Sequence, residues 1–288
     1  MRVLILGVSG MIGSTMFRVF SERAQWTVFG VARSDGVGSF FSSAMNARLI
    51  SGVDANNHDV LVRVFGDVRP NLVINCIGLT KHHPHCLEPL LAIPINTLLP
   101  HRLADLCRAI GARFIQVSTD CIFSGNEGNY VEDDAADAAD VYGKSKFLGE
   151  INAPHAVTLR TSTIGHELKS AFGLLEWFLA QTGQCKGFDR AIFSGLPSVT
   201  FAHVVRDVVI SQPELSGIFH VGAEPISKYD LLKLIARTYR KSIEIHRDDS
   251  FVIDRSLNLG RFRSATGYVA PDWPELITLM HRDQQLKN

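Results

Sequence analysis

The sequence predicts an α/β fold in which a parallel sheet is covered by helices on both faces. Short apolar runs, such as residues 2–7 and 72–78, alternate with longer segments whose apolar residues recur at helical spacing. Strands of a parallel sheet are buried on both faces, so they are apolar throughout. Glycines directly after the first strand predict a doubly wound sheet of the Rossmann type.

The composition indicates a globular protein with a large core. The chain has 288 residues, 46% of them hydrophobic and 20% charged, which is enough for two domains or for one large α/β unit. Its 29 basic and 29 acidic residues cancel, so we expect no nucleic-acid partner and no membrane partner. No apolar run reaches the ~18 residues that span a bilayer, and we expect no signal peptide. Five scattered cysteines favour a cytoplasmic protein with free thiols.

The first strand leads into a glycine turn and a helix. Gly7, Gly10 and Gly13 follow at a spacing of three. Glycine permits a tight turn, close approach of backbone N–H groups to a pyrophosphate, and close helix packing. The pyrophosphate would lie at the positive helix N-terminus. Any tight strand–helix turn favours glycine, but this position favours a dinucleotide site. Its expected residues are Gly7, Gly10, Met11, Ile12 and Gly13.

The second and third strands predict the adenosine side of that site. Residues 26–32 end at Arg33, where an NAD-preferring site usually has Asp or Glu. Arg33 would pair with a 2′-phosphate, which makes NADP(H) the preferred cofactor and NAD(H) the alternative. A solvated loop arginine is the other interpretation. Asp54, after a short third strand, would touch the adenine side or cap the next helix.

The fourth strand, residues 72–78, ends in small residues that let a cofactor cross the carboxyl edge of the sheet. These are Cys76, Ile77 and Gly78. Lys81 then opens a segment, residues 81–86, with three histidines and a cysteine. The spacing fits no usual zinc site and a proline interrupts it, so we expect no metal. A loop over the active site is the better interpretation, with Lys81 or a histidine meeting the substrate.

The fifth strand, residues 114–119, ends at Thr119. Asn96, counted among the cofactor-binding residues, leads into the helix before this strand, and Gly111 stops that helix. Open α/β sheets place their chemistry at the carboxyl ends of strands, which favours a functional Thr119. The acidic, alanine-rich stretch at residues 125–140 is expected to be exposed.

Tyr142 and Lys146 are four residues apart, one turn apart on the same face if the segment is helical. A lysine beside a tyrosine favours the phenolate, so we expect the pKa of Tyr142 to fall from about 10 toward neutrality. A phenol tuned that way can pass a proton to or from an alcohol or ketone oxygen. The alternative interpretation is that Tyr142 is a half-buried helix tyrosine without a catalytic role. With Thr119 upstream, the set predicts carbonyl reduction or its reverse.

The second half of the chain alternates less regularly. A sixth strand ends at Arg160, and Ser227 is expected to cap a helix over residues 228–239. Trp177, on an aromatic helix, would line a ligand pocket or pack in the core. Arg255 belongs to a group of arginines that would clamp a diphosphate bidentately or remain solvated.

Four motifs resemble the extended short-chain dehydrogenase/reductase superfamily and, within it, the dTDP-4-dehydrorhamnose reductase family. The Ser-Thr-Asp stretch is the most specific, and the resemblance extends over nearly the whole chain. The motifs are the glycines of residues 7–13, Val-Ile-Asn-Cys at 73–76, Val-Ser-Thr-Asp-Cys-Ile-Phe-Ser-Gly at 117–125, and Tyr-Gly-Lys-Ser-Lys-x-x-Gly-Glu at 142–150.

The resemblance implies a Rossmann domain over residues 1–155 and a smaller C-terminal α/β substrate domain over residues 156–288. Segments around 188–222 are expected to interleave with the sheet. It implies Thr119, Tyr142 and Lys146 as the catalytic set, the last two also touching the cofactor. The residues expected to bind substrate are Lys81, Thr119, Asp120, Arg160, Trp177 and Arg255.

The implied function is NADPH-dependent reduction of the 4-keto group of a nucleotide-linked 6-deoxy sugar, for surface polysaccharide. One alternative is an epimerase or 4,6-dehydratase, but Cys121 follows Asp120, which leaves the acid/base pair of a dehydratase incomplete. Another is a non-catalytic NADP-binding regulatory subunit, which the intact Thr–Tyr–Lys set disfavours. The sequence is compatible with a homodimer. Departures at residues 77–83 and 197–198 concern the sugar, not the hydride chemistry.

Overall fold

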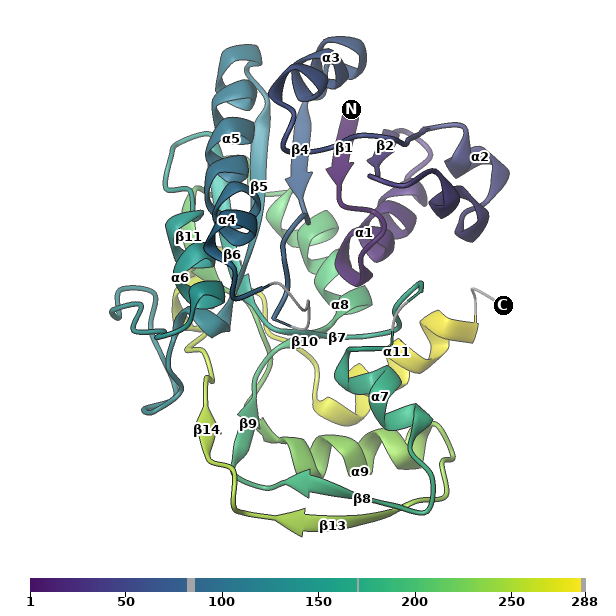
Figure 1. The fold of residues 1–288 in the computed structure, drawn as a ribbon, viewed down its shortest axis with the longest axis vertical. Helices are drawn as coiled ribbons and strands as arrows, with labels where there is room; N and C mark the ends of the chain where they lie inside the picture. The colour runs from purple at the N-terminus through teal and green to yellow at the C-terminus, as the bar shows by residue number, and fades with distance from the viewer. Residues whose placement is uncertain (82–85, 170, 286–288) are drawn as a thin grey trace.

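A computed structural model describes residues 1–81, 86–169 and 171–285 and confirms the predicted α/β architecture (Figure 1). The central sheet has 7 strands in the order β11-β6-β5-β4-β1-β2-β3, all paired in parallel. Its strands are β1 (Arg2–Leu6), β2 (Thr27–Val31), β3 (Leu49–Ile50), β4 (Leu72–Asn75), β5 (Arg113–Thr119), β6 (Ala156–Thr161) and β11 (Gly217–His220). The chain starts in the middle and fills first one side and then the other, as in a doubly wound sheet.

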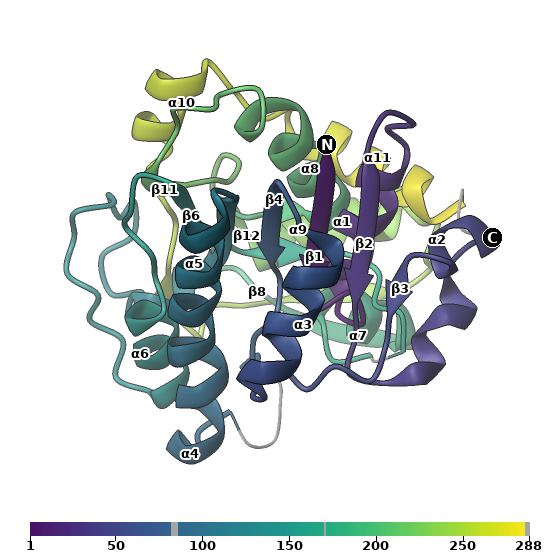
Figure 2. The ribbon, with the colours of Figure 1, turned by 90° about the horizontal axis from the view of Figure 1, so that it is seen from above.

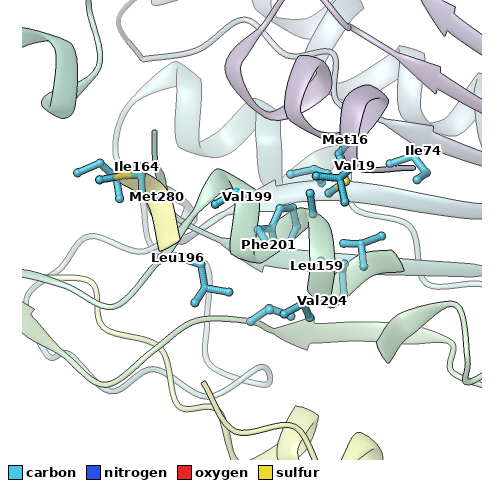
Figure 3. Close-up of a cluster of buried hydrophobic side chains, with 14 of the residues drawn as sticks. Met16, Val19, Ile74, Leu159, Ile164, Leu196, Val199, Phe201, Val204 and Met280 are labelled. Atoms are coloured by element: carbon cyan, nitrogen blue, oxygen red, sulfur yellow. The ribbon is translucent and has the colours of Figure 1, made fainter. Parts of the chain in front are cut away.

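Helices cover both faces of the sheet (Figure 2). One face carries α3 (His58–Val68) and α5 (Leu99–Ile110), and the other carries α1 (Met11–Ser21), α8 (Ser198–His203) and α11 (Trp273–Gln285). Figure 3 shows the second interface, where Val199 and Phe201 of α8 are buried with Leu159 of the sheet and Met280 of α11. Because both faces are covered, the strands are apolar throughout.

Local signals set the ends of these helices. Asn57 caps α3 by accepting hydrogen bonds from the N–H groups of Asp59 and Val60, and Gly111 ends α5 with a φ of 69°. The helical stretch before β5 begins earlier than predicted, with α4 (Pro89–Ala92) and a π-helical turn, Ile93–Leu98. Pro94 has no N–H to donate, and the wider turn around it accommodates that loss.

Smaller elements lie beyond the carboxyl ends of the main strands (Figure 1). Three strands form one sheet in the order β12-β9-β14, while β8 pairs with β13 and β7 with β10. The bounds are β7 (Thr163–Ile164), β8 (Gln184–Phe188), β9 (Ala191–Phe193), β10 (Leu196–Pro197), β12 (Ile226–Ser227), β13 (Glu244–Asp248), β14 (Ile253–Asp254), α7 (Leu174–Ala180), α9 (Lys228–Thr238) and α10 (Gly260–Thr266). The remaining elements are α2 (Ser43–Asn46), α6 (Val141–Leu148), the 3-10 turns Asp35–Phe40 and Asp120–Ile122, and the π-helical turn Val204–Val209.

The stretch at residues 125–140 is anchored in the fold, so its predicted exposure is wrong in part. Tyr130 and Glu132 are buried, and the Tyr130 ring stacks on Phe123 with centroids 4.2 Å apart. Glu132 accepts a hydrogen bond of 2.9 Å from the backbone N–H of His220 in β11. The acidic composition suggested solvent, but partners far along the chain hold these two residues inside.

Two further features concern the expected free thiols and the expected absence of a membrane span. The five cysteines are free thiols. Within the described ranges, no helix is both long and apolar enough to cross a bilayer.

Candidate active site

The glycine turn between β1 and α1 is built for close backbone packing. Gly7 has a φ of 86°, and a Cβ there would lie 2.9 Å from the carbonyl carbon of Cys76. A Cβ on Gly13 would lie 2.2 Å from the carbonyl oxygen of Gly7. Gly10 precedes the first turn of α1, and a Cβ there would meet its nearest neighbour only at 3.6 Å. The turn therefore leaves the positive helix N-terminus open, and it fits a dinucleotide pyrophosphate.

Helix α6 carries Tyr142 and Lys146, both buried. Asp140 caps it, accepting a 2.7 Å hydrogen bond from the N–H of Gly143. Only glycine fits at position 143, because a Cβ would lie 2.4 Å from the carbonyl oxygen of Cys121. The missing side chain lets α6 approach the turn after β5, which brings Tyr142 to the end of that strand.

Thr119 ends β5 within reach of Tyr142. Its hydroxyl donates to Asp120 Oδ1 at 3.2 Å and accepts from the N–H of Cys121 at 3.1 Å. The Thr119 side chain also lies close enough to the Tyr142 phenol to lower its pKa. The structure thus brings together the threonine and the phenol predicted to act on one substrate oxygen.

The predicted fall in the pKa of Tyr142 is wrong. Burial is the largest effect and raises the pKa of this phenol, and the neighbouring Cys121 acts in the same direction. The Lys146 ammonium donates to the carbonyl oxygen of Val117 at 2.9 Å. Burial lowers the pKa of Lys146 to about 8, against opposing effects of Glu150 and Cys76. Sequence reasoning counted the charge of the lysine and left out the burial of both groups.

Asn96 joins the segment after β4 to helix α6. Its side-chain oxygen accepts from the N–H of Leu79 at 2.8 Å, and its Nδ2 donates to Ser145 Oγ at 3.1 Å. A Cβ on Gly78 would lie 3.6 Å from Asn96 Oδ1 and 3.7 Å from Lys146 Nζ. Three of the predicted cofactor residues, Gly78, Asn96 and Lys146, therefore meet at one place.

The adenosine-side residues lie at the surface. Arg33 is exposed, and its side chain forms no hydrogen bond or ion pair within the described part of the chain. Asp54 is also exposed and accepts a 3.0 Å hydrogen bond from the N–H of Asn56. The helix cap considered for Asp54 is supplied by Asn57. No described residue occupies the Arg33 guanidinium, so it is available for a contact with a 2′-phosphate.

Several charged side chains surround Asp120. Burial raises the pKa of the Asp120 carboxyl, against opposing effects that include the charges of Arg255 and Lys228. Arg255 donates to the carbonyl oxygen of Phe123 at 2.7 Å. Lys81 forms an ion pair with Asp140 at 3.1 Å. Sequence reasoning missed Lys228, because a lysine in the first turn of a helix looks like an ordinary surface residue.

The histidines considered as metal ligands, His82, His83 and His85, lie outside the described residues. Among residues 1–81, 86–169 and 171–285, no group of three or more His, Cys, Asp or Glu side chains is placed to hold a metal ion.

The two remaining predicted substrate contacts are Arg160, which pairs with Ser118 in the sheet, and Trp177 on α7. Arg160 is buried and donates to both carboxylate oxygens of Glu150, to the backbone oxygen of Glu132 and toward His220. Its nitrogens are therefore engaged inside the protein and not presented to a ligand. Trp177 is 39% exposed on α7, whose Leu175 and Phe178 face the core. No described contact links Trp177 to Tyr142 or Thr119.

Comparison with known proteins gives the family. The family model described as the RmlD substrate binding domain matches residues 1–248. Methionine adenosyltransferase 2 subunit beta of Xenopus tropicalis is 25% identical over 261 residues, 83% of this chain and 72% of that protein. dTDP-4-dehydrorhamnose reductase of Aggregatibacter actinomycetemcomitans is 25% identical over 240 residues, 80% of this chain and 76% of that protein.

A solved structure shares the fold. dTDP-4-dehydrorhamnose reductase of Bacillus anthracis, in complex with NADP, superposes with a TM-score of 0.80 at 18% identity and covers 98% of each chain. The family match spans most of this chain, and the motifs at the carboxyl edge of the sheet agree with it. The protein therefore belongs to the RmlD substrate binding domain family, within the extended short-chain dehydrogenases/reductases.

Proposed function

We propose that this protein is an NADPH-dependent reductase of the 4-keto group of a nucleotide-linked 6-deoxy sugar, acting in surface polysaccharide biosynthesis. The observation that carries the proposal is the convergence of Thr119, Tyr142 and Lys146 at the carboxyl edge of a sheet with an open glycine turn. The reductase names of its relatives support the substrate class. The NADP of the B. anthracis structure supports NADP(H) as preferred cofactor, with NAD(H) second.

The glycine turn and Arg33 would hold the cofactor, at its pyrophosphate and its 2′-phosphate. When bound, the nicotinamide supplies the hydride, because no side chain can. Tyr142 donates its phenol proton to the ketone oxygen. Its raised pKa keeps that proton in place at neutral pH. Thr119 orients the same oxygen through its hydroxyl. The Lys146 cation stabilises the phenolate form of Tyr142 that remains after the proton is transferred.

The two parts of the chain would each bind one of the two ligands. Residues 1–155 provide the glycine turn, Arg33 and the catalytic set, so we assign them to the cofactor. Residues 156–288 add β6 and β11 to the sheet and then supply Arg255, so we assign their remaining elements to the sugar nucleotide. Lys81 and Asp120 would complete the substrate side.

Two rival functions have less support. A dehydratase would need an acid/base pair beside Thr119, where this chain has Asp120 and Cys121. A regulatory subunit is suggested by the similarity to methionine adenosyltransferase 2 subunit beta. A subunit without catalysis has no need of a buried phenol beside a threonine and a lysine, yet this chain assembles all three.

The test is to follow NADPH oxidation with a panel of dTDP- and UDP-linked 4-keto-6-deoxy sugars. Turnover with at least one of them, accompanied by an alcohol product, is expected. A protein that binds NADPH in a one-to-one ratio but turns over none of the panel would favour the regulatory subunit. Loss of water from an intact nucleotide hexose that still carries its 6-hydroxyl, with no net consumption of NADPH, would favour the dehydratase.

A further inference from the structure

Residues 165–169, here called the strap, follow β7 and connect two turns of the dinucleotide site. At one end, a Cβ on Gly165 would lie 3.4 Å from the sulfur of Met11, the first residue of α1. At the other end, the Lys169 ammonium donates to the carbonyl oxygen of Gly36 at 3.3 Å, in the 3-10 turn after β2. Figure 1 shows the chain extending beyond β7 toward these N-terminal elements. Both contact points follow the carboxyl ends of the neighbouring strands β1 and β2, where open α/β sheets bind their ligands.

The base of the strap is fixed by the smaller elements of the second half of the chain. His166 is buried, and its Nδ1 and Nε2 lie 2.7 Å from Glu176 Oε1 and 2.9 Å from the Tyr239 hydroxyl. Glu176 belongs to α7, and Tyr239 directly follows the last residue of α9. Because both ring nitrogens of His166 are held, the strap starts from a fixed position and carries Lys169, three residues later, to a defined place.

The partners of Lys169 position its ammonium but do not neutralise it. The acceptor on Gly36 is a neutral carbonyl, and 3.3 Å is slightly longer than an ordinary N–H···O hydrogen bond. The ammonium also lies 5.3 Å from the centroid of the Phe40 ring, a contact that attracts a cation without cancelling its charge. Lys169 is exposed, and it forms no ion pair with any residue in the described ranges. Its charge is therefore available to an anion.

Arg33 offers a second such charge at the same end of the site. It stands three residues before Gly36, is exposed, and has no partner among the described residues. The carboxylate of the same turn, Asp35, is directed elsewhere. A Cβ on Gly52, after the edge strand β3, would lie 3.8 Å from Asp35 Oδ1, so this carboxylate lies toward the outer edge of the sheet. Arg33 and Lys169 therefore leave net positive charge at the adenosine end.

Two cations at this end match one chemical group. NADP(H) differs from NAD(H) by its 2′-phosphate, and a phosphate monoester carries about −1.5 to −2 charges at pH 7. A guanidinium and an ammonium are the side chains that bind such a group through charge-assisted hydrogen bonds. Lys169 would exchange a neutral carbonyl for the phosphate, so no ion pair has to break when the cofactor binds.

We propose that Lys169 binds the 2′-phosphate of NADP(H) together with Arg33, so that both halves of the chain set the cofactor preference. The proposal rests on the proposed function for the class of cofactor. The assignment of Lys169 itself rests on its contact with Gly36 and on the course of the strap from the glycine turn. Since His166 fixes the strap to α7 and α9, the same contact would tie the bound cofactor to the elements assigned to the sugar nucleotide.

Calorimetric titration of the full-length protein with NADP+ and with NAD+ tests this without catalysis. Lys169→Met removes the charge and keeps an apolar stem. It should weaken the affinity for NADP+ by roughly tenfold or more, the usual worth of a charge-assisted hydrogen bond. The affinity for NAD+ should stay within twofold. Lys169→Arg should retain most NADP+ affinity, because it keeps the charge and the donors.

The matched control is Lys233→Met on α9, because this exposed lysine also has its ammonium over an aromatic ring, 5.1 Å from the centroid of Tyr229. It should bind both dinucleotides as the parent does. Unchanged NADP+ affinity in Lys169→Met would overturn the proposal. Equal losses for NADP+ and NAD+ would also overturn it, because Lys169 would then only hold the strap in place. A parent that binds NAD+ as tightly as NADP+, or binds neither, would overturn it as well. NADP+ binding through Lys169 in a protein that turns over no keto sugar would overturn the proposed function alone.

Discussion

The ammonium of Lys146 donates to the carbonyl oxygen of Val117, 2.9 Å away, although Tyr142 lies one turn earlier on the same helix. Lys146 is therefore held against β5 by a neutral acceptor. An ammonium that burial destabilises, and that a neutral carbonyl compensates only in part, costs folding free energy while it remains charged.

Replacing Lys146 by Met should stabilise the protein at neutral pH and abolish most activity. The folded pKa is lowered from 10.5 to about 8, so the unfolded chain binds more protons between these values. The parent's stability consequently rises with pH through that window and is lowest below it. The variant should exceed the parent by about 1–3 kcal/mol at pH 7, and the Val117 carbonyl keeps the Gln116 amide as a donor.

Urea unfolding of both proteins at pH 7, 9 and 10.5 measures the difference in their free energies of unfolding. Groups that titrate alike in both proteins do not contribute to this difference. The variant's advantage should shrink as the pH rises. A Met variant that is less stable at pH 7, or a difference independent of pH, would show that Lys146 is not destabilised by burial.

Tyr142→Phe should bind NADPH as the parent does and lose roughly two to four orders of magnitude in kcat, the usual worth of a general acid. The matched control is Tyr239→Phe, because the Tyr239 hydroxyl is bonded to His166, away from the catalytic set. That variant should keep kcat within a few-fold. Stopped-flow hydride transfer is the measurement, and more than a tenth of parental activity in Tyr142→Phe would refute the assigned role.

Arg33→Ala should reduce kcat/KM for NADPH by roughly tenfold or more and leave the value for NADH unchanged. The exposed guanidinium has no partner among the described residues, and a charge-assisted contact with a 2′-phosphate would be lost with it. Arg63→Ala, on an exposed position of α3, is the control. Equal use of both cofactors by the parent would make Arg33 an ordinary surface charge.

The features of this molecule that could be predicted are those set by residues close together in the sequence. Apolar runs such as β4 predicted buried parallel strands, and the glycine spacing predicted a turn whose geometry the fold requires at Gly7 and Gly13. Thr119 and Tyr142 could be predicted as partners because a motif resemblance joined them. Burial, which reverses the expected pKa shift of Tyr142, is a property of the assembled fold.

The less predictable parts depend on contacts between distant segments. Lys228 and Arg255 follow β12 and β14, which pair with the same strand, and both lower the pKa of Asp120 far earlier in the chain. Arg160 ends a strand at the functional edge, which suggested a ligand contact. Its carboxylate partner Glu150 is only ten residues earlier, but sequence spacing did not reveal that both would be buried.

Glu150→Gln should therefore destabilise the protein by about 3–5 kcal/mol, because it leaves the buried Arg160 cation without a counter-charge. Both side chains are 3% exposed, and the Arg160 Nη2–Glu150 Oε2 distance is 2.8 Å. Ser118 also donates to Glu150, at 2.7 Å, so the substitution disturbs β5 beside Thr119 as well.

Asp105→Asn is the matched control, since it breaks an ion pair with Arg108 whose side chains are 72% and 71% exposed. Exposed pairs contribute about 0–1 kcal/mol, so this variant should unfold close to the parent. Chemical denaturation of all three proteins gives the comparison. If Glu150→Gln unfolds like the control but raises KM for the sugar nucleotide, then Arg160 acts on the substrate after all. A loss of stability with KM unchanged in the folded fraction would establish that Arg160 and Glu150 serve the fold.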